Sequence, residues 1–215
     1  LGRIETHDGA LNAFITVTAD QAREAAATAD QELEKGQWRG LLHGIPVVLK
    51  DIYDTAGVLT TCHSKLFADR IPTKDCDTWD RLSGAGAILL GKTATHEFAT
   101  GGPSFDLPWP PARNPWNPDH FTGGSSSGSG AAMAAGMALG TLGTDTAGSI
   151  RMPAFFCGIT GLKPTYGRVS RRGVSPLGYS LDHCGPMTWT ARDAAIMLQA
   201  LAAYDPEDPG SAEQP

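Results

Sequence analysis

Residues 123–130 read GGSSSGSG and run directly into residues 131–140, AAMAAGMALG, which are small or apolar and carry no charge. The second segment predicts a buried helix, and the glycines before it allow a close approach of the backbone. A flexible linker of the same composition would lead into polar sequence instead. A phosphate-binding loop requires Gly-Lys-Ser or Gly-Lys-Thr, and no lysine occurs between Lys92 and Lys163.

The third interpretation of residues 123–130 is a catalytic serine loop. One kind of catalytic serine loop is the nucleophile elbow. Residues 124–128 formally match G-x-S-x-G. An elbow must follow a strand, but residues 117–122, NPDHFT, do not resemble one. The required Asp and His occur only as the adjacent pair Asp182 and His183. The sequence therefore favours a catalytic serine loop of another kind.

The flanking sequence predicts an α/β fold in which helices alternate with short apolar strands and cover most of the sheet. A long irregular loop rich in Pro, Gly, Asn and Trp separates the two halves of the pattern. The predicted elements are helices over 19–35, 78–84 and 131–140, strands over 41–51 and 87–92, and the loop over 101–124.

Composition limits the classes of function. The chain has 215 residues, 41% hydrophobic and 19% charged, with a net charge of -6, which is typical of one large globular domain. Lys and Arg are dispersed, so we expect no nucleic-acid binding, and the one dense basic group is expected to be a solvated loop. No apolar run is long enough to span a membrane, so we expect a soluble, cytoplasmic protein. The basic group comprises Arg168, Arg171 and Arg172.

Cysteine and histidine spacing predicts no metal site. The four cysteines are too widely spaced for a disulfide scaffold or a CxxC site, so we expect buried free thiols, and the six histidines share no ligand spacing. The chain begins at Leu1 rather than methionine and ends in a loop-like stretch, residues 205–210. We therefore expect residues 1–215 to be the N-terminal portion of a single domain whose C-terminal part is missing. The cysteines are Cys62, Cys76, Cys157 and Cys184.

Several motifs in order make the chain resemble the amidase signature family, most clearly over residues 40–190. This resemblance implies an α/β/α fold with a mixed central sheet. It also implies hydrolysis of a carboxamide C–N bond in a small-molecule substrate, through an acyl-enzyme and without metal or cofactor; ester and carbamate cleavage stays open. The motifs are GGSSSGS at 123–129, GTDTAGSIR at 143–151, CGITGLKPTYGRVS at 157–170, GIP at 44–46 with Lys50 and Asp51, and SLDH with GPMT at 180–188.

The resemblance implies a triad of Ser149 as nucleophile, Ser125 after a cis peptide bond, and Lys50 as base. A serine hydroxyl needs a base in hydrogen-bond contact. Lys50 ends an apolar run, residues 45–49, where desolvation would lower its pKa toward neutrality. Ser125 would pass the proton between the other two residues.

The turn before Ser149 is expected to aim backbone N–H groups of Thr146, Ala147 and Gly148 at the developing oxyanion. The family usually has glycine where this chain has Ala147, which keeps the N–H donor. By resemblance, three further residues line the acyl side of the pocket: Ala99, Gly101 and Gly102.

Two other functions stay open. The glutaminase subunit of a tRNA-dependent amidotransferase shares these motifs, although residues 103–113, with Pro-Trp-Pro-Pro, favour a free-standing amidase. A non-catalytic scaffold is the second alternative, and the intact triad positions argue against it. Substrate identity and a homodimer are left undecided, because the fold and the triad do not set them.

Overall fold

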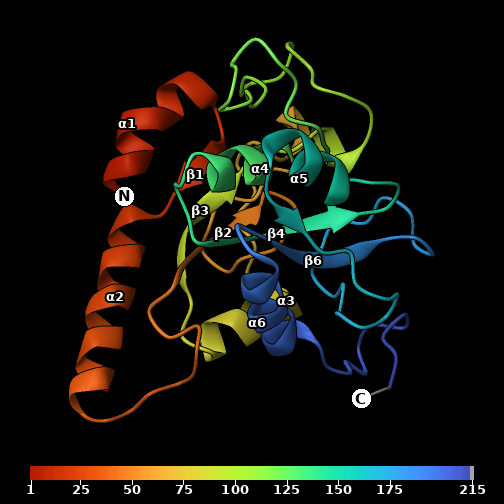
Figure 1. Ribbon diagram of the computed structural model, residues 1–215. Helices are drawn as coiled ribbons and strands as arrows, with labels where there is room; N and C mark the ends of the chain where they lie inside the picture. The colour runs from red at the N-terminus through yellow and green to blue at the C-terminus, as the bar shows by residue number, and fades with distance from the viewer. Residues whose placement is uncertain (214–215) are drawn as a thin grey trace.

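The computed structural model describes residues 1–213, which form one mixed sheet with helices on both faces (Figure 1). The helices are α1 (Gly2–Leu11), α2 (Ala19–Glu34), α3 (Asp77–Gly84), α4 (Ser127–Ala134), α5 (Arg151–Cys157) and α6 (Ala191–Leu201), with 3-10 turns η1 (Lys65–Phe67) and η2 (Glu97–Ala99). The strands are β1 (Phe14–Val17), β2 (Pro46–Lys50), β3 (Ile88–Thr93), β4 (Gly140–Asp145), β5 (Thr160–Gly161) and β6 (His183–Thr188).

The strand order is β1-β3-β2-β4-β6-β5, with a parallel centre and antiparallel edges. Strand β2 pairs in parallel with both β3 and β4, and Leu49 lies opposite Leu142. Parallel neighbours end at the same edge of a sheet, so the residues after β2 and β4 meet there. That edge carries the site described below.

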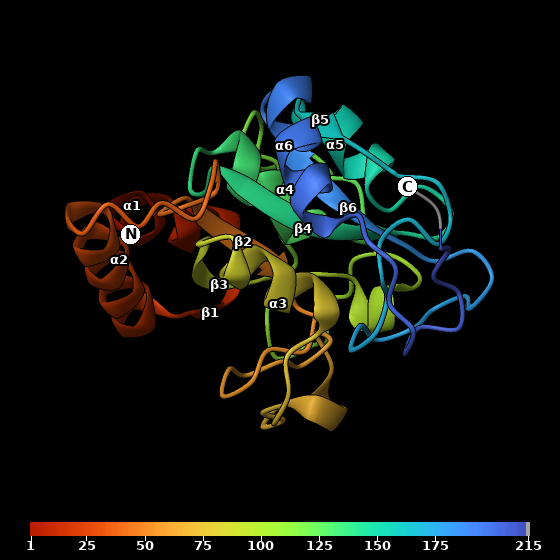
Figure 2. The ribbon, with the colours of Figure 1, turned by 90° about the horizontal axis from the view of Figure 1, so that it is seen from below.

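Side-chain alternation along β2 divides the core into two layers. Val47 and Leu49 pack with α3 and α6, whereas Val48 packs with α1 and α4. Figure 1 shows α4 and α5 above the sheet and α3 and α6 below it. In Figure 2, seen from below, α3 lies over the part of the sheet with β2 and β3, and α6 lies over the part with β4 and β6. The expected α/β/α architecture is therefore confirmed.

Local sequence predicted some elements well and one poorly. The helices over 19–35 and 78–84 and the strand over 87–92 are present within one residue at each end. The strand predicted over 41–51 is shorter, because residues 41–44 form a turn and β2 begins at Pro46. Residues 101–124 contain no helix or strand, as expected. The helix predicted over 131–140 is wrong in its bounds, because α4 begins at Ser127 and β4 begins at Gly140. Ser127 and Ser129 thus lie in the first turn of the helix, whereas Ser125 and Ser126 precede it.

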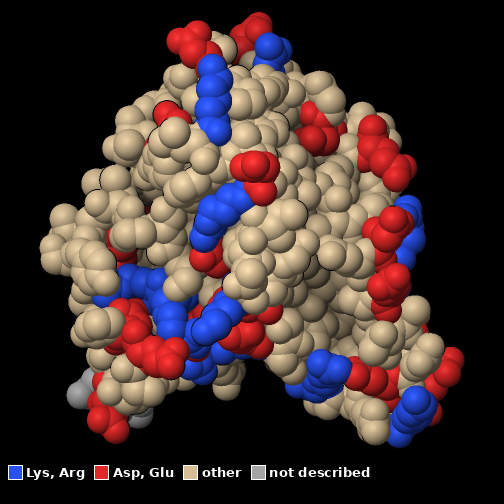
Figure 3. Space-filling model, turned by 180° about the vertical axis from the view of Figure 1, so that it is seen from behind, with Lys and Arg blue, Asp and Glu red and all other residues tan. Residues whose placement is uncertain are grey.

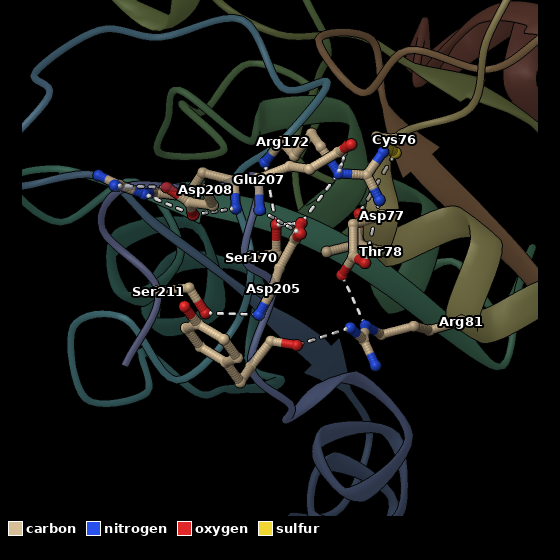
Figure 4. A network of polar contacts seen from close by, with 12 residues as sticks. Cys76, Asp77, Thr78, Arg81, Ser170, Arg172, Asp205, Glu207, Asp208 and Ser211 are labelled. Carbon is tan, nitrogen blue, oxygen red and sulfur yellow. Dashed lines mark hydrogen bonds and ion pairs between the residues drawn. The ribbon is translucent and has the colours of Figure 1, made fainter. Parts of the chain in front are cut away.

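The expectation of a solvated basic loop is wrong for Arg171 and Arg172. Arg171 forms a two-pronged ion pair with Asp208, and its side chain is only 11% exposed. Figure 4 shows Arg172 between Asp77 and Asp205, which also accepts a hydrogen bond from Ser170. Residues 203–213 contain only turns, but these ion pairs fasten them to the body of the domain.

Charges of both signs are interleaved on the face seen in Figure 3. Within residues 1–213, no helix is long and apolar enough to cross a membrane. The described part of the chain also has no group of three or more His, Cys, Asp or Glu side chains arranged to hold a metal ion. All four cysteines are buried and free.

Candidate active site

Lys50, the last residue of β2, lies entirely inside the domain. Its Nζ donates hydrogen bonds to Ser125 Oγ and to Thr144 Oγ1, each at 2.7 Å. No carboxylate lies within ion-pair distance of this ammonium among the described ion pairs. The parallel pairing of β2 and β4 places Thr144 beside Lys50, so two neighbouring strands define the position of the amine.

Burial lowers the pKa of Lys50 from 10.5 to about 7, because removal from water penalises the charged ammonium. The negative charges of more distant groups, including Asp182 and Asp145, oppose this shift without reversing it. A lysine with this pKa is largely neutral at slightly alkaline pH, and a neutral amine can accept a proton.

Ser125 lies just before α4, and the peptide bond between Gly124 and Ser125 is cis, as the resemblance implies. The Ser125 side chain is almost fully buried. The neighbouring Ser126 connects the two serine segments, since its N–H donates to the Ser149 carbonyl at 3.3 Å and its hydroxyl donates to the Thr144 carbonyl. The segments before α4 and α5 are therefore held side by side.

Ser149 lies in a turn organised by the buried carboxylate of Asp145. The carboxylate accepts hydrogen bonds from the N–H groups of Gly148 at 2.7 Å and Ile150 at 3.2 Å, and it pairs with Arg151 at 2.9 Å. Burial alone would raise the pKa of Asp145, but these hydrogen bonds lower it below its ordinary value. The Ser149 hydroxyl is half-buried and has no hydrogen-bond partner within residues 1–213.

The backbone donors of this turn differ in their availability. The Gly148 N–H is already engaged by Asp145. The N–H groups of Thr146, Ala147 and Ser149 have no partner among the described residues. Three main-chain donors in one turn can bind an anionic oxygen.

Asp182 supports the first residue of this turn. Its carboxylate accepts a hydrogen bond from Thr146 Oγ1 at 2.5 Å and further bonds from the N–H groups of Leu177 and Gly178. The loop over 177–182 is thereby tied to the serine turn.

A cavity of about 200 Å³ has Thr144, the hydrogen-bond partner of Lys50, in its wall, whereas Lys50, Ser125 and Ser149 do not line it. Ala99, a predicted pocket residue, lines this cavity together with Cys184. Gly101 and Gly102 are exposed and lie outside the described lining. The remaining wall comes from residues 171–177, Tyr179, Asp182 and residues 207–209.

Sequence reasoning missed the contributions of Thr144 and Asp145. Both belong to the stretch GTDTAGSIR at 143–151, in which the sequence predicted roles only for residues 146–149. Asp145 gave a detectable signal, because it is the only acidic residue between Asp119 and Asp182. An isolated charge in an otherwise apolar stretch is usually paired when buried.

Gly130 lies where α4 packs against α5. A Cβ at this position would lie 3.1 Å from Pro153 Cβ and 3.2 Å from Cys157 Sγ. Glycine thus allows α4 to pack closely on α5.

Residues 1–215 match the family model described as Amidase. The chain belongs to the amidase family. This amidase chain is 53% identical to a glutamyl-tRNA(Gln) amidotransferase subunit of Trichlorobacter lovleyi, over 100% of its own length and 44% of that relative. The predicted family resemblance is therefore confirmed.

Solved structures agree with this assignment. The peptide amidase of Stenotrophomonas maltophilia superimposes with a TM-score of 0.93 at 40% identity, over 100% of this chain and 45% of that one. The corresponding amidotransferase subunit of Thermotoga maritima gives a TM-score of 0.85 at 36% identity, over 100% and 44%. The amidase chain spans less than half the length of these relatives.

Proposed function

We propose that the protein hydrolyses the C–N bond of a carboxamide, with Ser149 as nucleophile, Ser125 as proton relay and Lys50 as base. The observation that carries the proposal is the 2.7 Å contact between Lys50 Nζ and Ser125 Oγ, made by a buried lysine without a counter-ion. Buried lysines are usually paired with a carboxylate. Lys92 is equally buried, but its amine donates to the Tyr53 carbonyl and the Thr60 hydroxyl, so only Lys50 contacts a serine of the motif. The peptide amidase among the structural neighbours supports the same reaction class.

The proton path follows from the order of the three groups. Ser149 Oγ attacks the carbonyl carbon and passes its proton to Ser125, which passes its own proton to the neutral Lys50 amine. When the tetrahedral intermediate collapses, the C–N bond breaks and the amine leaves with a proton from Ser125, which Lys50 replenishes. Water then attacks the acyl-enzyme through the same relay and releases the carboxylic acid.

The N–H groups of Thr146, Ala147 and Ser149 stabilise the negative oxygen formed in each addition step. The Gly148 N–H instead holds the turn through Asp145. In this arrangement Gly148 shapes the oxyanion hole and does not donate to it. Its backbone, with φ of +134°, adopts a conformation that glycine favours.

The decisive experiment compares Ser149→Ala with Ser126→Ala in the full-length protein. A panel of aryl amides, fatty amides, glutamine, esters and carbamates identifies a substrate, and a fluorophosphonate probe reports the nucleophile. We expect Ser149→Ala to abolish both turnover and labelling. Ser126→Ala should retain labelling at Ser149, because Ser126 lies outside the relay. Normal turnover by Ser149→Ala would refute the assignment.

A second candidate function is the glutaminase reaction of a tRNA-dependent amidotransferase. The observation that favours it is the sequence identity, which is higher to the Trichlorobacter protein, at 53%, than to the peptide amidase, at 40%. Purification of the protein from its native cell distinguishes the two candidate functions. A stable complex with partner proteins and strict dependence on glutamine would favour the glutaminase, whereas an unpartnered enzyme acting on other amides would favour the first proposal.

A further inference from the structure

His96 lies beneath the segment that carries Ser125, between β3 and the turn η2. Its side chain is buried, and its Nε2 has no hydrogen-bond partner among the described residues. A buried polar atom without a partner costs free energy, so its retention needs an explanation. The contacts of His96 supply one.

The main chain of His96 holds the backbone of Ser125. Its N–H donates to the Ser125 carbonyl at 3.1 Å. Two residues earlier, the Ala94 carbonyl accepts the N–H of Gly128 at 2.9 Å. The segment after β3 therefore holds the backbone at Ser125 and at Gly128.

The imidazole ring packs directly against Gly124, the residue before the relay serine. A Cβ at Gly124 would lie 2.1 Å from Cε1 and 2.3 Å from Nε2 of His96, so only glycine leaves room for the ring. Phe121 stacks on the ring, with centroids 6.0 Å apart and planes inclined by 23°. The ring is thus held between Phe121 and the Gly124–Ser125 peptide.

The ring is uncharged over the working range of pH. Burial lowers the pKa of His96 to about 4, and the nearby positive charge of Lys50 adds to the effect, while a backbone hydrogen bond with Gly101 opposes it. An uncharged ring fills this space without electrostatic repulsion of Lys50. A permanently charged residue of similar size would repel a protonated Lys50.

We propose that His96 is a positioning residue for proton relay: its ring and N–H together hold the Gly124–Ser125 peptide so that Ser125 Oγ lies in reach of Lys50. This inference rests on the proposed triad. A misplacement of about 1 Å in a reacting group can cost about 100-fold in rate. We therefore expect His96→Asn, which removes the ring, to slow labelling of Ser149 by about 10-fold to 100-fold.

The test is a double-mutant cycle on the full-length protein, with the second-order rate of fluorophosphonate labelling as readout. If His96 acts through Ser125, His96→Asn should change the rate less than about 3-fold in a Ser125→Ala background. A purely structural role would give the same loss in both backgrounds, and that result would overturn the proposal. A wild-type rate for the single variant would also overturn it.

The matched control is His43→Gln. The side chain of His43 is also buried, at 1% exposed, but it accepts the Arg39 N–H and contacts the Ala29 carbonyl, which belong to α2 and the segment after it. Any loss of labelling rate that this control variant causes should be the same in the wild-type and Ser125→Ala backgrounds. If His96→Asn does not fold, Phe121→Leu removes only the stacking partner and must show the same non-additivity.

The Ser125→Ala variant alone separates the two proposals. Labelling at the wild-type rate by this variant would refute the relay role of Ser125 and hence the triad. Slow labelling by Ser125→Ala together with an unchanged rate for His96→Asn would refute only the positioning role.

Discussion

The ammonium nitrogen of Lys50 lies 2.7 Å from the hydroxyl oxygen of Ser125, although 75 residues separate the two in sequence. The strand β2 supplies the first group and the segment before α4 supplies the second. Both side chains are buried, so water cannot replace either partner. This contact determines the first two predictions.

Replacement of Lys50 by Met should abolish most turnover while the fold is retained. Methionine has a similar length, lacks the base and avoids an unpaired buried amine. General base catalysis contributes about 10²-fold to 10⁴-fold, so kcat/KM should fall by that factor. Steady-state kinetics and circular dichroism measure the two properties. The control Lys35→Met, at the exposed end of α2, should leave both unchanged.

The pH dependence should show one ionisation near pH 7. Because Lys50 must be neutral to accept a proton and its pKa is about 7, kcat/KM should be low at about pH 5.5 and rise to a plateau above about pH 8. The unfolded chain holds this proton up to about pH 10.4, so unfolding free energy should also rise between about pH 7 and 10 through this group. A flat rate profile would contradict the assignment of Lys50 as base.

Replacement of Asp145 by Asn should disturb the serine turn. The asparagine keeps the shape but loses the charge that binds Arg151 and one acceptor for the backbone N–H groups. We expect labelling of Ser149 to slow by about 10-fold or more and the melting temperature to fall. Asp20→Asn, in the exposed pair with Arg23, is the control and should change neither quantity.

Replacement of Asp208 by Asn should loosen residues 203–213. The pair with Arg171 is nearly buried, and loss of one partner costs about 3 kcal/mol, or roughly 6–12 °C in melting temperature. Burial acts to raise the pKa of Asp208, but the hydrogen bonds from Arg171 and Gly210 lower it by a larger amount. The pKa of Asp208 is therefore below its ordinary value.

Because the pKa of Asp208 is lowered, the stability difference between wild type and Asp208→Asn should depend on pH. The stabilising effect of Asp208 is complete above about pH 4 and is lost as pH falls through the lowered pKa. The gap in melting temperature between wild type and Asp208→Asn should therefore be largest near pH 7 and shrink under strong acid. Calorimetry over this range measures it, and a gap independent of pH would contradict the ion-pair explanation.

Local sequence was sufficient for elements with a clear period or composition, such as α2 and β2. It was insufficient for β5, which has only two residues, and for α4, whose first turn consists of serine and glycine. The motif resemblance predicted Lys50 and Ser125, whose contact depends on strand pairing that no local pattern contains. The contacts of Asp145 and His96 with the serine segments depend on the folded chain and cannot be read from the linear sequence.

The parallel pairing of β2 with β4 has a consequence for how the proposed substrate choice can evolve. Lys50 and Thr144 belong to this rigid centre, whereas the cavity wall belongs mainly to residues 171–184 and 207–209, which are outside it. Under the proposed function, mutations in the wall can therefore change which amide is accepted while Lys50 and Ser125 stay in place.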